Sequence, residues 1–235
     1  MFFSSLCSSG WHPAIQGWQV VYYCVPHREQ RIGNSRPGFF ITIEGVEGAG
    51  KSTLAELLGK HLAADGAEVV VTAEPGGDPV GERVRQLLLD SANAISDRAE
   101  LLLFEAARAQ HVDKVILPAL ERGAIVICDR FADSSIAYQG CARGLGVEAV
   151  RMLNEYATGG LKPDLTILLD LPVEVGLARQ TRADRISSEQ LAFHQRIRDG
   201  YLSSARSEPQ RFVVIDATLE IEDVLKQALS AVDEL

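Results

Sequence analysis

Residues 39–53 read FFITIEGVEGAGKST, an apolar run followed by a glycine-rich loop. FFITI has the β-branched and aromatic composition of a buried strand, and the TLAELLGKHL segment that follows the loop has helical spacing. Between them, GVEGAGKS fits the pattern G-x-x-x-x-G-K-[S/T]. Glycines let successive backbone N–H groups converge on phosphate oxygens, and the start of a helix adds a positive dipole end. The stretch therefore predicts a phosphate-binding loop between a strand and a helix.

The rest of the chain from Phe39 alternates between two kinds of segment. Apolar runs suited to buried strands lie at residues 39–43, 68–72, 124–128, 165–169 and 212–216. Segments with helical spacing lie at Lys51–Ala64, Asp97–Arg122, Val147–Thr158, Ser188–Ser204 and Leu219–Val232. This alternation predicts a three-layer α/β sandwich with a five-stranded parallel sheet. In such a sheet, ligands bind beyond the carboxyl ends of the strands.

Composition narrows the class of protein. The chain is 46% hydrophobic and 23% charged, which is enough to bury a core. Its net charge of −9 argues against a nucleic-acid partner. No apolar run approaches the roughly 18 residues of a transmembrane helix, and the cysteines lack metal-ligand spacing. We expect a cytoplasmic protein without a membrane partner, in which Cys128 is a buried thiol.

Residues 1–38 differ from the remainder. They contain both tryptophans and little helical periodicity, and they end in the breaker-rich sequence GNSRPG. They lack the basic start and the cleavage site of a clear targeting peptide, although such a peptide stays an alternative. The sequence predicts a flexible extension, followed by one domain over residues 39–235.

The residues of the loop and of the segment 128–130 suggest separate roles in binding a nucleoside triphosphate. Lys51 supplies positive charge for the β- and γ-phosphates, and the Ser52 hydroxyl is a ligand for Mg²⁺. Asp129 follows an apolar strand, where a carboxylate also holds Mg²⁺, and Arg130 offers a fork of donors to a phosphate. The predicted ATP-binding residues of the loop are Gly45, Val46, Glu47, Gly48, Ala49, Gly50, Lys51, Ser52 and Thr53.

Four further segments carry a resemblance to a known family. They are TAEPGGDPVGERVRQLLLD (72–90), LLLFEAARAQH (101–111), CDRFADSSIAYQG (128–140) and LDLPVEVGLARQTRADRISSE (169–189). Together with the loop they resemble the bacterial thymidylate kinases, over about residues 39–235. The resemblance implies a P-loop NTPase fold and a homodimer. It also implies Mg²⁺- and ATP-dependent phosphorylation of dTMP to dTDP, for dTTP synthesis.

The same resemblance implies an acceptor site. Phe104 stacks on the thymine, and Arg108, four residues later on the same helix face, hydrogen-bonds a base carbonyl. The Gln139 amide meets the base, and Tyr138 packs beside the 2′ carbon, which favours deoxyribose. Glu47 contacts the 3′-hydroxyl of the sugar. The predicted acceptor-site residues are Glu47, Glu74, Pro75, Phe104, Arg108, Arg130, Ser134, Ser135, Tyr138 and Gln139.

One position departs from the family, and a second distinguishes its two branches. Ala73 stands where an arginine usually precedes the glutamate of the EPGG turn, so Arg130 carries more of the acceptor phosphate. Arg83 and Arg85 are candidates to compensate, although both could be solvated. Gly48 stands where one branch of the family has an arginine.

A lid at about residues 178–189 is expected to supply the missing charge. We expect Arg182 and Arg185 to be catalytic together with Lys51 and Arg130, and Arg179 to lie near the base of ATP.

Two alternatives stay open at this point. One is a kinase of the same fold with another acceptor, such as dUMP, CMP or a non-nucleotide. The other is a P-loop protein that binds or senses nucleotide without turning over an acceptor. No N-K-x-D or L-S-G-G-Q segment is present, which disfavours a GTPase or a transporter ATPase.

Overall fold

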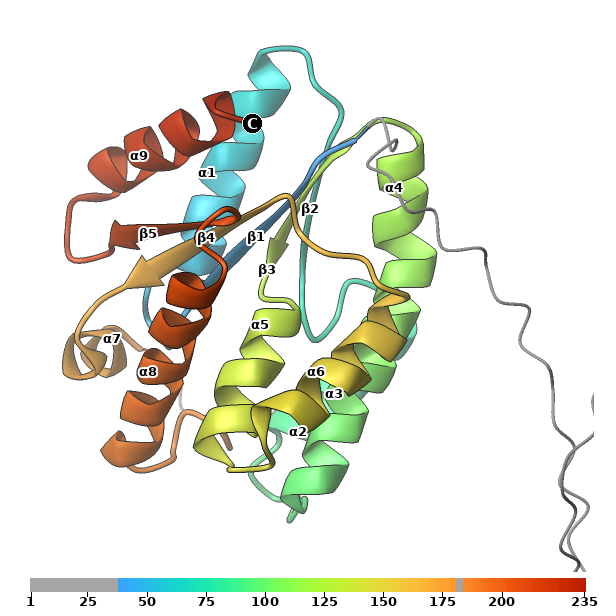
Figure 1. The fold of residues 1–235 in the computed structure, drawn as a ribbon, viewed down its shortest axis with the longest axis vertical. Helices are drawn as coiled ribbons and strands as arrows, with labels where there is room; N and C mark the ends of the chain where they lie inside the picture. The colour runs from blue at the N-terminus through green and yellow to red at the C-terminus, as the bar shows by residue number, and fades with distance from the viewer. Residues whose placement is uncertain (1–37, 181–183) are drawn as a thin grey trace, which may run out of the picture. The chain divides into compact units, whose positions relative to one another are not determined.

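The computed structural model describes residues 38–180 and 184–235. They contain a five-stranded parallel sheet with the order β2-β3-β1-β4-β5 (Figure 1). The strands are β1 (Phe40–Gly45), β2 (Val69–Ala73), β3 (Ile125–Asp129), β4 (Leu165–Asp170) and β5 (Phe212–Asp216). Each of the five apolar runs forms a strand, so the predicted fold class is confirmed.

The helices surround this sheet. They are α1 (Lys51–Ala64), α2 (Pro79–Leu89), α3 (Asp97–His111), η1 (Val112–Ile116), α4 (Leu117–Glu121), α5 (Ala132–Ser135), η2 (Ile136–Ala142), α6 (Val147–Thr158), α7 (Val173–Arg179), α8 (Leu191–Ser207) and α9 (Ile221–Asp233). The bounds of α1 and α6 match the prediction. The long helix expected at Asp97–Arg122 forms as the consecutive run α3, η1 and α4, with a π-helical turn in its middle.

Alternation along β1 assigns its side chains to the two layers of helices. Ile41 and Ile43 pack in one core cluster with Leu54 of α1. Phe40 packs in a second cluster with Leu120 of α4. Helices α1 and α9 pack on each other and on the strands, whereas α8, α5 and α4 contact the sheet from the other side (Figure 1).

The central position of β1 places the loop that follows it. In register, β1 pairs with β3 on one side and β4 on the other, so the loop begins where the connections diverge to opposite edges. Because the strands are parallel, the carboxyl ends of β1, β3, β4 and β5 lie at the same end of the sheet. No helix within residues 38–180 and 184–235 has the length and apolar character that crossing a bilayer requires.

Candidate active site

The loop after β1 is folded as a phosphate cradle. Gly48 has φ 70° and Gly50 has φ 91°, and Gly50 is the residue that caps the start of α1. Such angles are strained for residues with a Cβ atom. Lys51 is buried, and its ammonium donates a hydrogen bond to the Val46 carbonyl oxygen at 2.8 Å. Burial lowers the pKa of Lys51 to about 8.

A close backbone contact holds this cradle against α7. A Cβ atom on Gly48 would lie 1.9 Å from the carbonyl oxygen of Gly176, and one on Gly176 would lie 2.3 Å from that of Glu47. Atoms cannot approach so closely, so the two glycines permit the contact between the loop and α7. An arginine at residue 48 would therefore displace α7.

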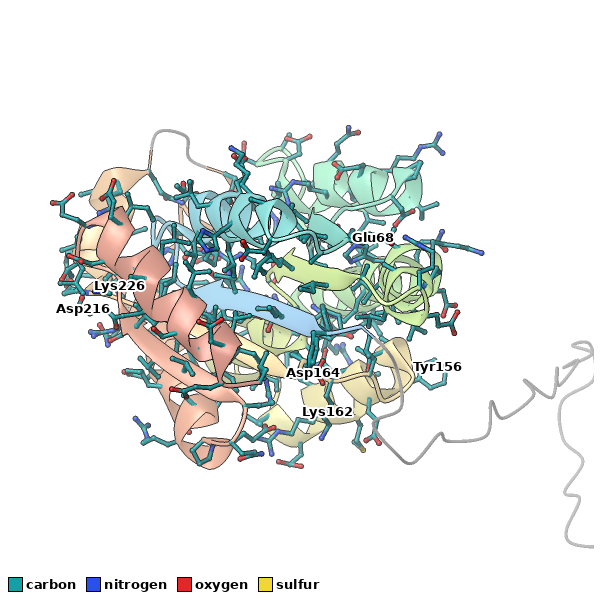
Figure 2. The ribbon with its side chains drawn as sticks, turned by 90° about the horizontal axis from the view of Figure 1, so that it is seen from above. Glu68, Tyr156, Lys162, Asp164, Asp216 and Lys226 are labelled. Atoms are coloured by element: carbon teal, nitrogen blue, oxygen red, sulfur yellow. The ribbon has the colours of Figure 1, made fainter. Side chains whose placement is uncertain are left out.

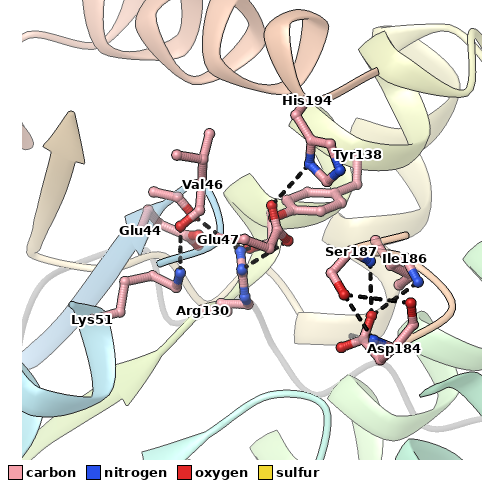
Figure 3. Close-up of polar contacts among 12 residues, drawn as sticks. Glu44, Val46, Glu47, Lys51, Arg130, Tyr138, Asp184, Ile186, Ser187 and His194 are labelled. Atoms are coloured by element: carbon pink, nitrogen blue, oxygen red, sulfur yellow. Dashed lines mark hydrogen bonds and ion pairs between the residues drawn. The ribbon is translucent and has the colours of Figure 1, made fainter. Parts of the chain in front are cut away.

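Glu47 faces away from the phosphate cradle. Its Oε1 accepts hydrogen bonds from the Tyr138 hydroxyl and, at 3.3 Å, from Arg130 Nη2. Its Oε2 lies 3.1 Å from Nδ1 of His194 (Figure 3). Burial alone would raise the pKa of Glu47, but His194, Arg130, Lys51 and Tyr138 together lower it to about 2. Glu47 is therefore an ionised carboxylate held by donors from three separate elements.

Arg130 is the second component of the site. It has a left-handed backbone, with φ 72°, and follows the carboxyl end of β3. Its Nη1 donates to the Gly45 carbonyl at 3.1 Å and to the Tyr201 hydroxyl at 3.2 Å. Its guanidinium lies 5.0 Å from the centre of the Tyr138 ring. The side chain is 20% exposed, so a cationic fork is fixed at the mouth of the sheet.

Asp129 and Ser52 meet at the start of α1. The Ser52 hydroxyl donates to Oδ2 of Asp129. Oδ1 of Asp129 is buried, and no hydrogen-bond partner for it exists among the described residues. A hydroxyl beside an unpartnered carboxylate oxygen is the oxygen donor set that Mg²⁺ prefers. The two residues predicted to hold Mg²⁺ therefore lie together and fit that ion.

Arg108 is the centre of a buried network on the acceptor side. It is 2% exposed, and its Nε donates to Glu74 at 2.8 Å. Its Nη2 donates to the Phe131 carbonyl at 3.0 Å. The acceptors for Nη1 are Glu105, Ser135 and Asn154. Nη2 carries two hydrogens, and the Phe131 carbonyl accepts one of them.

Other predicted acceptor residues surround this network. Phe104 is partly buried, one helical turn before Arg108 on α3. Gln139 is buried, and its Nε2 donates to Glu100 at 2.9 Å. Ser134 donates to Glu44 at 2.7 Å. The carbonyl of Pro75 accepts from Arg85 at 2.9 Å.

Comparisons with known proteins now identify the family. The family model described as Thymidylate kinase matches residues 43–228. The chain belongs to the thymidylate kinase family. The thymidylate kinase of Desulfovibrio desulfuricans is 52% identical over 205 residues, covering 83% of this chain and 94% of that protein. That of Geobacter sp. is 52% identical over 195 residues, covering 79% and 87%.

A solved structure of the same family has the same fold. The crystal structure of thymidylate kinase from Ehrlichia chaffeensis superposes with a TM-score of 0.70 at 35% sequence identity. The match covers 83% of this chain and 98% of that one. The predicted resemblance to thymidylate kinases is therefore confirmed.

The lid arginines of this thymidylate kinase family member occupy different places. Arg179, at the end of α7, donates to the Ala217 carbonyl after β5 at 2.9 Å. Arg185 forms an ion pair with Glu100 at 2.7 Å and donates to the Leu88 carbonyl at 2.8 Å. Arg182 lies outside the described residues. The structure thus does not place Arg185 beside the cradle.

The position of Ala73 can also be assessed. It pairs with Asp129 at the carboxyl ends of β2 and β3, so the family's arginine would have entered the site from here. Of the two candidates to compensate, Arg83 is exposed. Arg85 is partly buried and supports the EPGG turn through Pro75. Within the described residues, Arg130 is therefore the arginine whose guanidinium contacts Glu47.

The sequence reasoning missed Glu44 and His194, and also Tyr201, whose hydroxyl contacts Arg130 and Glu44. Glu44 is fully buried and accepts from Phe131 N at 2.8 Å and from Tyr201 at 2.9 Å. A carboxylate inside an apolar strand was a signal that could have found it. His194 gave no such signal, because it contacts Glu47 across 147 residues of sequence.

Proposed function

We propose that this chain transfers the γ-phosphoryl group of ATP to dTMP at the carboxyl edge of its sheet. The thymidylate kinase family supports the reaction and its two substrates. The observation that supports this location is that the two sides of the loop between β1 and α1 suit two different substrates. Lys51 and the backbone cradle suit a donor polyphosphate, whereas Glu47 is held by Arg130 and Tyr138 on the acceptor side.

On the donor side, the N–H groups of residues 45–53 and Lys51 bind the phosphates of ATP. Arg179, at the end of α7 and bonded to the Ala217 carbonyl after β5, is proposed to contact the base of ATP. Asp129 and Ser52 would hold Mg²⁺, which when bound neutralises charge on the donor phosphates. Asp129 keeps a buried oxygen without a partner in the described part of the chain, and this supports the assignment.

On the acceptor side, Arg130 offers its guanidinium to the phosphate of dTMP. Phe104 stacks on the base, and Arg108 donates to a carbonyl of thymine. Glu47 accepts from the 3′-hydroxyl, and Tyr138 occupies the space that a 2′-hydroxyl would need. The further acceptor contacts of this proposal come from Glu74, Pro75, Ser134, Ser135 and Gln139.

The chemistry requires positioning and charge more than a base. The acceptor phosphate already carries negative oxygens, and the transferred group passes through a loose transition state. Lys51 and Arg130 stabilise the charge of that state from the two sides of the loop. Arg182 of the lid is proposed to add a third cation, and lid closure excludes water.

The test is ADP release with ATP and Mg²⁺ in the presence of dTMP, dUMP, CMP or dCMP. We expect strong stimulation by dTMP and at most weak stimulation by CMP and dCMP. Lys51→Met should abolish it, since removing the charge on the phosphates costs several orders of magnitude in such transfers. If CMP or dUMP stimulates better than dTMP, the acceptor is wrong. If nothing stimulates, the chain binds nucleotide without this turnover.

We also propose a homodimer that forms through α3 and α6. These helices pack side by side and present apolar side chains to solvent, with exposed fractions of 56% at Leu102, 67% at Met152 and 85% at Tyr156. Figure 2 shows Tyr156 at the outer surface of the molecule. Large exposed apolar side chains that cluster on one face are typical of interfaces.

Residues 1–38 are proposed to be dispensable for catalysis, because the family model begins its match at residue 43. A chain that starts at Pro37 should release ADP at the rate of the full chain, and a loss above about fivefold, or about 1 kcal/mol, would contradict this. We also propose a cytoplasmic location.

A further inference from the structure

His194 lies in the first turn of α8 and is completely buried, with 0% exposure. Its ring meets the ring of Phe193 edge to face, with centroids 5.6 Å apart. Its Nδ1 lies 3.1 Å from Oε2 of Glu47, and Figure 3 shows the imidazole pointing at this carboxylate. A residue of α8 therefore reaches directly into the loop between β1 and α1.

The two oxygens of Glu47 are used unequally. Oε1 receives the Tyr138 hydroxyl and Arg130 Nη2, whereas His194 is the partner of Oε2 within the described part of the chain. A carboxylate oxygen accepts about two hydrogen bonds, so Oε2 keeps one acceptor position. Glu47 is an ionised acceptor, which requires Nδ1 of His194 to be the donor of this bond.

The other ring nitrogen supports a functional origin for this contact. Nε2 of His194 is buried, and residues 38–180 and 184–235 provide no hydrogen-bond partner for it. A buried polar atom without a partner costs free energy, so an apolar side chain would serve packing at this place better. The polar contact that His194 makes is the one with Glu47.

We infer that His194 is a positioning residue, which orients Glu47 so that the free side of Oε2 accepts the 3′-hydroxyl of the acceptor nucleotide. This inference rests on the proposed function. It adds to that function a determinant of specificity for nucleoside monophosphates that carry a 3′-hydroxyl. Tyr138 and Arg130 hold Oε1, and His194 fixes the remaining rotation of the carboxylate plane.

The experiment compares two acceptors in the full chain, dTMP and its 3′-deoxy analogue. The variants are His194→Leu, which keeps much of the volume but has no donor, and His194→Asn, whose amide can donate from near the position of Nδ1. For His194→Leu we expect KM for dTMP to rise roughly tenfold or more. KM for the 3′-deoxy analogue and for ATP should change less than about threefold. His194→Asn should recover most of the loss.

Gln195→Leu is the matched control, because it removes a polar side chain from the next residue, where the partner is Asp199 on the same helix. It should leave both acceptors unaffected. The inference fails if His194→Leu weakens dTMP and the 3′-deoxy analogue equally, which is the result of a packing role. It also fails if His194→Asn is as impaired as His194→Leu while both melt at the wild-type temperature.

A double variant gives a second, independent measurement. If His194 acts through Glu47, adding His194→Leu to Glu47→Gln should change KM for dTMP less than about twofold. Full additivity of the two effects would overturn the inference. Absence of dTMP turnover in the wild-type chain would instead refute the proposed function, so the two failures are distinguishable.

Discussion

Glu44 and Glu47 lie close together in the chain, yet their carboxyl groups have pKa values of about 7 and about 2. Burial raises the pKa of Glu44, and the charge of Asp133 adds to the shift, while Ser134, Arg130 and the Phe131 N–H oppose it. Glu47 is also buried, but the donors around it outweigh the burial. One junction of strand and loop thus holds both a carboxyl that protonates near neutral pH and a permanent anion.

At the residue scale, this difference predicts a pH dependence of stability. The pKa of Glu44 is raised from 4.5 in the unfolded chain to about 7 in the fold. The folded state therefore binds the proton more tightly, and its contribution is present below pH 4.5 and lost as pH rises through 7. Between pH 5 and 8.5, we expect the unfolding free energy of wild type to fall by about 3 kcal/mol relative to Glu44→Gln.

Urea unfolding of both proteins at the two pH values measures this difference. Glu56→Gln is the control, because Glu56 is an exposed carboxylate on α1 that forms an ion pair with the exposed Lys60. It should follow the pH dependence of wild type. Parallel curves for wild type and Glu44→Gln would show that Glu44 is ionised throughout the range.

At the scale of elements, the sequence predicted what local periodicity encodes. Helices α1 and α6 have the predicted bounds, and all five strands form. Helix α2 was missed, although Asp78 accepts from Val80 N at 2.8 Å and Pro79 stands at the first helical position, a start signal that is visible in the sequence.

The start of α8 was misplaced for a different reason. Asp184 accepts the N–H groups of Ile186 and Ser187 at 2.9 and 2.8 Å (Figure 3). This turn delays the helix to Leu191, three residues after the predicted start. Side chains that bond to nearby backbone compete with the helix, and periodicity alone does not reveal the outcome.

The contact between α7 and the loop gives the next prediction. Gly176→Ala places a methyl group 2.3 Å from the Glu47 carbonyl oxygen, so α7 or the loop must move. We expect a loss of about 1–3 kcal/mol in stability and a rise of KM for ATP. Val175→Ala, at an exposed position of the same helix, should have neither effect. Thermal unfolding measures the loss of stability, and steady-state kinetics measure KM for ATP. Wild-type values for Gly176→Ala would show that α7 and the loop accommodate the methyl group without cost.

The lid gives a prediction in which two arginines behave differently. Arg185 is held by Glu100 and by the Leu88 carbonyl, so we expect Arg185→Ala to affect lid anchoring and to lower kcat modestly, by about tenfold or less. Arg182→Ala should lower kcat by roughly a hundredfold or more with little change in stability, if it contacts the transferred group. Single-turnover rates and melting temperatures separate these roles. If Arg185→Ala lowers kcat more than Arg182→Ala does, Arg185 is the residue that contacts the transferred phosphoryl group.

At the scale of the whole molecule, the site combines residues that the sequence keeps far apart. Glu47 meets Tyr138 and His194 across 91 and 147 residues. Motif spacing predicted the cradle, Asp129 and Arg130, because the cradle and Arg130 follow a strand and Asp129 is the last residue of one. The roles of Phe104 and Gln139 came from the family resemblance. His194 and Tyr201 could not be predicted either way, since their contacts depend on how α8 packs across the sheet.

The surface formed by α3 and α6 carries the last prediction. If it buries Leu102, Met152 and Tyr156 between two copies, the chain should have about twice its 25.5 kDa mass in light scattering. Met152→Glu with Tyr156→Glu should give monomers, because two charges would be buried without partners.

Since α3 also carries Phe104 and Arg108, KM for dTMP should rise several-fold in that variant. Lys226→Glu on α9 changes charge on an exposed position elsewhere and should leave the mass unchanged (Figure 2). If the double variant is still a dimer, the interface lies elsewhere. If wild type is a monomer, there is no such interface.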